Sequence, residues 1–82
     1  MASPSKEALL HELLVTKLKK MLGEARGMAV VGEVLAKLGK RQIETPDELK
    51  KAADELISRG GLTKMIGHSI MTEALLRGAR TG

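Results

Sequence analysis

Imidazole and thiol groups at suitable spacing carry out many catalytic steps and bind most transition metals in proteins, and this 82-residue chain has few of them. It contains no Cys, and its two His residues, His11 and His68, lie far apart in the sequence. Without Cys there can be no disulfide, thiolate nucleophile or Cys-based zinc site. Neither His has a second His or a Cys at helical spacing. The sequence therefore predicts no metal site and no cofactor site.

The histidines also fail as catalytic groups. His11 falls within the apolar arc of a predicted helix, near Leu18 and Leu22, where we expect a partly buried imidazole with a structural hydrogen bond. His68 and Ser69 are neighbours on another predicted helix, where adjacent side chains diverge by about 100° and cannot form a nucleophile–base pair. We therefore predict no catalytic residue and no enzyme.

The string Gly67-His68-Ser69-Ile70 resembles the GHSL motif of peptidyl carrier domains, whose serine takes a phosphopantetheine arm. In that family the serine lies mid-domain and two more helices follow it, whereas only thirteen residues follow Ser69 here. The position of Ser69 therefore argues against a carrier domain.

The segment from Leu62 to Arg77 resembles a helix-turn-helix, with Gly67 at the turn and Thr72 on the recognition helix. The pattern breaks at Glu73, which stands where that motif has a core Val or Ile. Arg77 lies one helical turn further on and could pair with the carboxylate. This resemblance implies DNA binding as the alternative function.

Basic residues gather in the first half of the chain. Residues 1–41 hold eight Lys or Arg and four Glu, whereas residues 42–82 are balanced, so the first half carries the whole net charge of +4. Cations near helix C-termini also stabilise the helix dipole without any ligand, and a chain without aromatics cannot stack single-stranded bases. The residues that could contact nucleic acid are Lys17, Lys20, Arg26, Lys64, His68 and Thr72.

The first half, from Leu10-His11-Glu12-Leu13 to Ile43, is also loosely similar to the helical hairpin that opens some small DNA-packaging subunits of tailed phages. The similarity lies in helical spacing rather than in a motif. It implies a phage packaging-type protein as one form of the DNA-binding alternative.

Apolar periodicity and helix caps predict a single all-α domain over residues 1–82, ordered from about 4 to 78. We expect a compact bundle of four short helices near 4–22, 27–38, 46–59 and 62–77, with antiparallel neighbours because the connections are short. Ser3-Pro4 and Thr45-Pro46-Asp47-Glu48 have the composition of helix starts, and Thr45 with Glu48 forms a predicted capping box. Glycines between these segments are expected to end helices or form turns.

The last predicted helix is apolar on two faces. Leu62, Ile66, Ile70 and Ala74 recur at every fourth position and can serve the core, whereas Met71 and Leu75 fall on nearly the opposite side. Methionine adapts well to binding surfaces, so a second surface formed by Met71 and Leu75, aided by Met65, is a candidate protein interface. The leading hypothesis is a non-catalytic protein-interaction module that associates with itself as a homodimer through this helix.

Two further expectations concern location and ligands. No stretch approaches the roughly 18 apolar residues of a membrane helix, and the first residues lack the apolar core of a signal peptide. We therefore expect a cytoplasmic protein with no membrane contact and no small-molecule substrate.

Overall fold

The computed structural model describes residues 6–79 and contains four helices in this range, with no strand. They are α1 (Lys6–Leu22), α2 (Glu24–Leu38), α3 (Pro46–Arg59) and α4 (Gly61–Leu76). The predicted all-α bundle of four helices is confirmed. The predicted first-helix start at Ser3-Pro4 lies outside the described residues. No helix in this part of the chain combines the length and the apolar character that a bilayer crossing requires.

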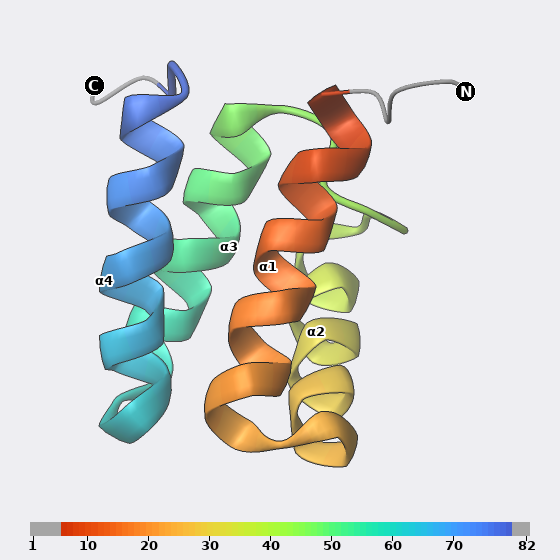
Figure 1. Ribbon diagram of the computed structural model, residues 1–82, viewed down its shortest axis with the longest axis vertical. Coiled ribbons are helices and arrows are strands. Elements are labelled where there is room, and N and C mark those ends of the chain that lie inside the picture. Colours follow the sequence, from red (N-terminus) through yellow and green to blue (C-terminus); the bar gives the residue numbers. More distant parts are fainter. Residues whose placement is uncertain (1–5, 80–82) are drawn as a thin grey trace.

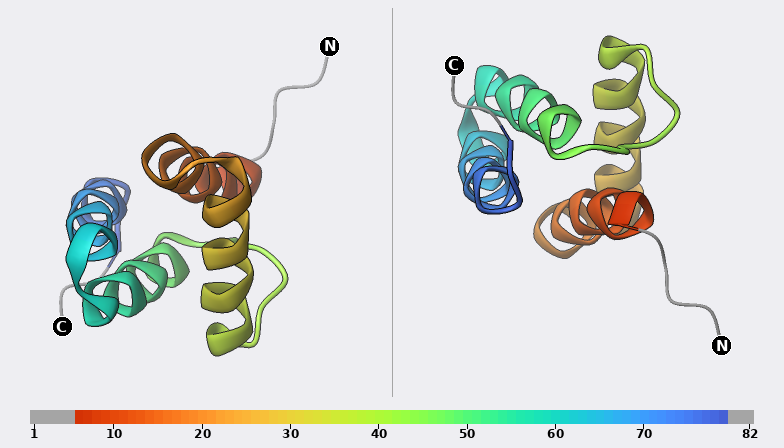
Figure 2. Two further views of the ribbon diagram at one scale, coloured as in Figure 1. Left: turned by 90° about the horizontal axis from the view of Figure 1, so that it is seen from below. Right: turned by 90° about the horizontal axis from the view of Figure 1, so that it is seen from above.

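The helices form two layers. Figures 1 and 2 show α1 and α4 side by side in front, with α2 and α3 behind them. The closest packing lies within two hairpins, α1 with α2 and α3 with α4. Figure 2 also shows that α2 runs steeply across the layers, so its far end diverges from the other helices. Two helices, α1 and α4, therefore form the front surface of the molecule.

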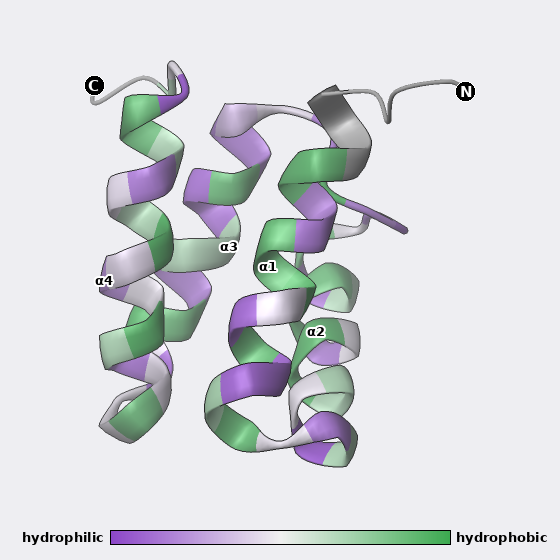
Figure 3. Ribbon diagram, viewed as in Figure 1, coloured by the Kyte–Doolittle hydropathy of each residue, from purple (hydrophilic) through white to green (hydrophobic). Residues whose placement is uncertain are grey.

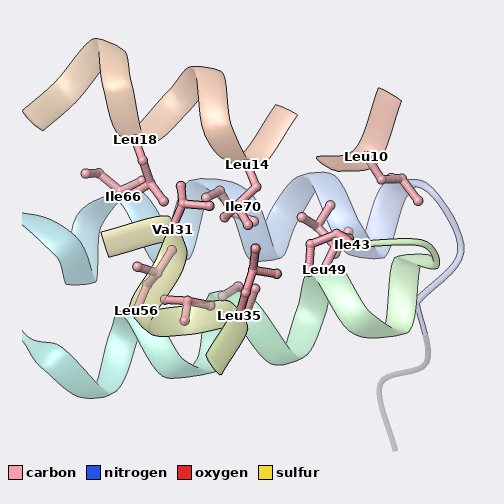
Figure 4. Packing of buried hydrophobic residues seen from close by; sticks show 14 of the residues in the cluster. Leu10, Leu14, Leu18, Val31, Leu35, Ile43, Leu49, Leu56, Ile66 and Ile70 are labelled. Atoms are coloured by element: carbon pink, nitrogen blue, oxygen red, sulfur yellow. The ribbon is translucent and has the colours of Figure 1, made fainter. Parts of the chain in front are cut away.

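One apolar cluster joins all four helices and the loop between α2 and α3. In Figure 4, Leu14 and Leu18 of α1 point toward Ile66 and Ile70 of α4. Each helix contributes one stripe to this core, as expected for amphipathic helices. The fully buried large side chains are Leu14, Leu18, Val34, Ile43, Leu49, Leu56 and Ile70.

The start of α3 is built as its sequence predicts. The Thr45 side chain accepts a hydrogen bond from the Glu48 backbone N–H (3.2 Å), and the Glu48 carboxylate accepts one from the Thr45 backbone N–H (3.3 Å). Pro46 occupies the first helical turn, where its missing N–H costs nothing. The predicted capping box is confirmed.

Gly27 and Gly67, which were expected at turns, lie inside helices instead. Gly23, with φ of 91°, makes the whole turn between α1 and α2, and α2 begins at Glu24 rather than near residue 27. Gly27 is buried inside α2, where a Cβ would lie 2.7 Å from the Lys19 backbone. Gly67 is buried inside α4, where a Cβ would lie 2.9 Å from the Ala53 carbonyl oxygen. Gly27 and Gly67 therefore allow neighbouring helices to approach closely.

Candidate protein-docking groove

The front layer contains an open groove between α1 and α4. Its lining residues come from the second half of α1 and the first nine residues of α4, and its volume is about 230 Å³. The sequence separates these two segments by more than forty residues, and only the antiparallel course of the two helices brings them together (Figure 1). The lining residues are Lys17, Lys20, Met21, Met65, Ile66 and Ser69.

The groove combines an apolar lining with basic side chains. Ile66 is buried, whereas Met21 and Met65 are 52% and 67% exposed. Across the groove, the Lys17 ammonium donates a hydrogen bond to the Ser69 hydroxyl oxygen (3.1 Å). Lys17 and Lys20 form no ion pair with any side chain that the structure describes, whereas the intervening Lys19 pairs with Glu24 (3.6 Å). The groove is therefore positively charged and offers exposed thioether groups.

The contact between Lys17 and Ser69 does not create a nucleophile. As an ammonium donor, Lys17 has no free electron pair with which to take the serine proton, and both groups are exposed to water. A lysine base needs the burial that removes its charge. This pair is better suited to holding α1 beside α4 than to catalysis.

Exposed apolar side chains concentrate on the same two helices. Within the described residues, six of the seven exposed large apolar side chains belong to α1 or α4 and one, Met28, belongs to α2. Figure 3 shows apolar segments at both ends of α4 and at the end of α1. The six are Leu9, Met21, Leu62, Met65, Leu75 and Leu76.

The exposed side of α4 has a regular spacing. Leu62, Met65, Ser69, Thr72 and Leu76 are all exposed and alternate three and four residues apart. This is the spacing of the contact positions in a coiled coil, where a second helix packs along one seam. Three of the five residues are large and apolar, so α4 presents a seam that a further helix could cover.

The three predicted interface residues do not form one surface. Met65 lies in the groove, but Met71 is partly buried and packs against the core. Leu75 is 38% exposed and lies about 15 Å from Met65 along the helix axis. The sequence alone could not show that Met71 packs against the core, because this contact depends on how α4 is oriented against the other helices.

The predicted nucleic-acid residues are also divided. Lys17 and Lys20 line the groove, whereas Arg26 lines a separate hollow of about 420 Å³ beside the turn between α3 and α4. Lys64, His68 and Thr72 are exposed on successive turns of α4. The structure thus brings together two of the six residues at the groove and three others along one stripe of α4.

The predicted helix-turn-helix is wrong. α4 runs without interruption from Gly61 to Leu76, so there is no turn at Gly67. Gly67 is instead pressed against α3, where a side chain would meet Ile57 and Ala53. Glu73 pairs with Arg77 at the end of α4, as expected, and both side chains are partly exposed.

The histidines take structural and surface positions. His11 is partly buried, and its Nδ1 accepts a hydrogen bond from the Ile43 backbone N–H (3.1 Å), which confirms the predicted structural role. This bond fixes the loop after α2 to α1. His68 is exposed. Among the described residues, no group of three or more His, Cys, Asp or Glu side chains could hold a metal ion.

Sequence reasoning missed the groove itself. Met21, Ile66 and Ser69 were not predicted site residues, and Met65 was assigned to a different surface from Lys17 and Lys20. The alternating spacing of exposed positions on α4 is the pattern that could have indicated it. Comparisons with protein-family models, curated proteins and solved structures give no match for this chain.

Proposed function

We propose that this chain is a non-catalytic protein-interaction module that binds its partners through the exposed apolar side chains of α1 and α4. The observation that carries the proposal is the concentration of six of the seven exposed large apolar side chains, among the described residues, on these two helices. Exposed apolar groups that gather on one part of a small protein typically mark an interaction site. Because these side chains are 38–76% exposed, a partner that covers one of them gains a corresponding part of the about 1.5–3 kcal/mol that burial of a whole apolar side chain provides.

We expect self-association at one edge of α4, the side that carries Leu75 and Met71. At about 100° per residue, Leu75 points roughly 120° away from the groove residue Ser69 around the axis of α4. Met71 next to it is partly buried, so Leu75 is the exposed anchor of this edge. In a two-fold dimer each copy would contribute the same edge, so one apolar residue is used twice. We therefore expect a homodimer in which α4 packs against α4 of the second copy.

Sedimentation equilibrium tests this expectation. The wild-type chain should approach the mass of a dimer at high micromolar concentration, and Leu75→Asp should return it to a monomer. Met28→Asp is the matched control, because Met28 is a similarly exposed apolar residue on α2. A wild-type chain that stays monomeric, or a Leu75→Asp variant that stays dimeric, would remove self-association through this edge.

Duplex DNA is the second candidate partner. It is supported by the exposed stripe of Lys64, His68 and Thr72 on α4 and by Lys17 and Lys20 at the groove. Phosphate contacts release counterions, so binding of this kind weakens steeply as salt increases. Titration with duplex DNA at two salt concentrations tests it, and an absence of binding at low salt would eliminate this candidate.

A further inference from the structure

We infer that the groove between α1 and α4 binds an amphipathic helix from another protein, with acidic residues flanking its apolar stripe. The inference rests on the proposed function and names the partner of one part of the proposed surface. It concerns the groove alone, whereas the predicted self-association uses Leu75 on the other side of α4.

The shape of the groove suits a helix. α1 and α4 run antiparallel in the front layer (Figures 1 and 2), and the groove between them is open rather than enclosed. Of the α4 positions with coiled-coil spacing, Met65 lines the groove, whereas Leu62 and Leu76 continue the same seam beyond its two ends, and Met21 faces the groove from α1. A helix laid along two parallel or antiparallel helices inserts its apolar side chains between theirs. Methionines at such a surface adapt to side chains of different shape.

The charge of the groove selects the partner. Two of its six lining residues are lysines and none is acidic. Lys17 and Lys20 have no ion-pair partner within the described residues, so their charges are available to a ligand. Carboxylates flanking the apolar stripe of a bound helix would contact the ammonium groups of Lys17 and Lys20. The stripe itself would cover the thioethers of Met21 and Met65. Complementary charge of this kind favours an acidic partner over a neutral or basic one.

A second copy of the chain is a poor occupant of this groove. Face-to-face pairing of two grooves about a two-fold axis would bring Lys17 and Lys20 of the two copies toward each other, and like charges oppose association. The most acidic helix of the chain, α3, cannot serve instead, since its apolar stripe is already buried in the core. That stripe consists of Leu49, Ala52, Ala53 and Leu56.

Fluorescence anisotropy with three labelled synthetic helical peptides tests the inference on the full chain. The peptides share one stripe of Leu and Met at alternating spacing of three and four residues and differ in flanking residues, which are Glu, Gln or Lys. We expect the Glu peptide to bind most tightly, with the Gln peptide weaker by roughly 2- to 30-fold, the combined effect of two exposed ion pairs. Higher salt should reduce this difference.

Charge reversal supplies the specific variant. Lys17→Glu with Lys20→Glu should invert the preference, so that the Lys peptide binds better than the Glu peptide. Lys37→Glu with Lys51→Glu is the matched control, because it makes the same change in net charge at exposed positions on α2 and α3. Circular dichroism verifies that all variants keep their helical content.

Each outcome has a defined meaning. If the Glu and Gln peptides bind equally and charge reversal changes nothing, but Met65→Glu abolishes binding, the acidic partner is wrong and the proposed function stands. If no peptide binds, the docking groove is overturned, and flotation with phosphatidylserine vesicles shows whether an anionic membrane takes its place. If neither Met65→Glu nor Leu75→Asp changes peptide binding or solution mass, the proposed function itself fails.

Discussion

Individual polar residues in this protein connect different helices and loops. His11 on α1 holds the loop after α2 through the Ile43 backbone, and Lys17 on α1 reaches Ser69 on α4. Lys40, just after α2, contacts Glu48 on α3 (2.8 Å) and Glu44 in the loop between them (3.2 Å). The contact of Lys17 with Ser69 joins two helices, and the others fix the loop between α2 and α3 against α1 and the start of α3. The contacts of Lys40 also make stability depend on pH.

The carboxyl of Glu48 is coupled to folding through its charge. Burial raises its pKa, but hydrogen bonds from Lys40 and from the backbone N–H groups of Glu44 and Thr45 outweigh this, and the net pKa lies below its ordinary value of 4.5. A carboxyl with a lowered pKa in the folded chain stabilises that chain above the unfolded pKa, and this contribution is lost as the pH falls through the folded pKa. Hydrogen bonds from Lys40 to Glu48 and Glu44 raise the pKa of Lys40 above its ordinary value of 10.5. The stabilisation that Lys40 contributes is therefore fully present below pH 10.5 and is lost as the pH rises through the raised pKa.

We predict that Glu48→Gln reduces the loss in the free energy of unfolding between neutral and acidic pH. Glutamine still accepts the backbone hydrogen bonds of the capping box but removes the charge facing Lys40. At neutral pH the free energy of unfolding should fall by up to about 1 kcal/mol, as for a partly exposed ion pair. Below about pH 4.5, the ordinary pKa of the group, the difference should begin to shrink, and the variant and the wild type should converge once the pH lies below the lowered pKa of folded Glu48.

Urea unfolding followed by circular dichroism at a series of pH values measures this effect. Asp54→Asn is the control, because Asp54 is an exposed residue of α3 with no ion pair among the described residues. A Glu48→Gln variant whose stability parallels the wild type at every pH would contradict the prediction.

At the scale of helices, close packing requires glycine at particular positions. A Cβ on Gly67 would lie 2.8 Å from Ile57 Cγ1 and 2.9 Å from both the Ala53 carbonyl oxygen and the Ile57 backbone nitrogen. Distances below 3.0 Å to backbone atoms force one helix away from the other. Gly32, by contrast, has nothing within 4 Å of such a Cβ and lies exposed on α2. Two glycines inside helices thus have opposite environments.

We predict opposite effects for the same substitution at these two glycines. Gly67→Ala should lower the free energy of unfolding by about 1–3 kcal/mol because it overpacks the contact between α3 and α4. Gly32→Ala should raise it by about 0.5–1 kcal/mol, since alanine favours the helix and meets no obstacle. Chemical unfolding of both variants checks the pair. Stabilisation by Gly67→Ala would contradict the close approach of α3 and α4.

The sequence predicts those features of the helices that depend on neighbouring residues. The capping box of Thr45 and Glu48 acts within one turn, and its prediction is confirmed. Apolar spacing likewise locates all four helices. The glycine environments could not be predicted, because the obstacle around Gly67 belongs to α3 and a glycine in a sequence indicates only a permissive backbone. The groove was missed for the same reason: Lys17 and Met65 meet only after α1 and α4 are placed side by side.

At the scale of the whole molecule, one core has to hold two hairpins together without any aromatic side chain. Most packing lies within the hairpins, and the contact between them depends on a few fully buried residues. Leu14 is central among these, since Figure 4 shows it pointing from α1 toward Ile70 of α4. Ile66 belongs both to this core and to the lining of the front groove, so the placement of the two groove walls depends on the core beneath.

We predict that the two hairpins unfold as one unit and that Leu14→Ala destabilises both. The substitution removes a side chain with no solvent exposure and should lower the free energy of unfolding by about 2–5 kcal/mol. Because a single cluster joins the helices, amide hydrogen exchange should accelerate in α3 and α4 as well as in α1 and α2. NMR-detected exchange measures each helix separately, and Thr16→Ala on the exposed side of α1 is the control. If Leu14→Ala accelerated exchange in α1 and α2 while α3 and α4 kept their wild-type protection, the hairpins would be independent units, and the groove between α1 and α4 would lie across a flexible junction.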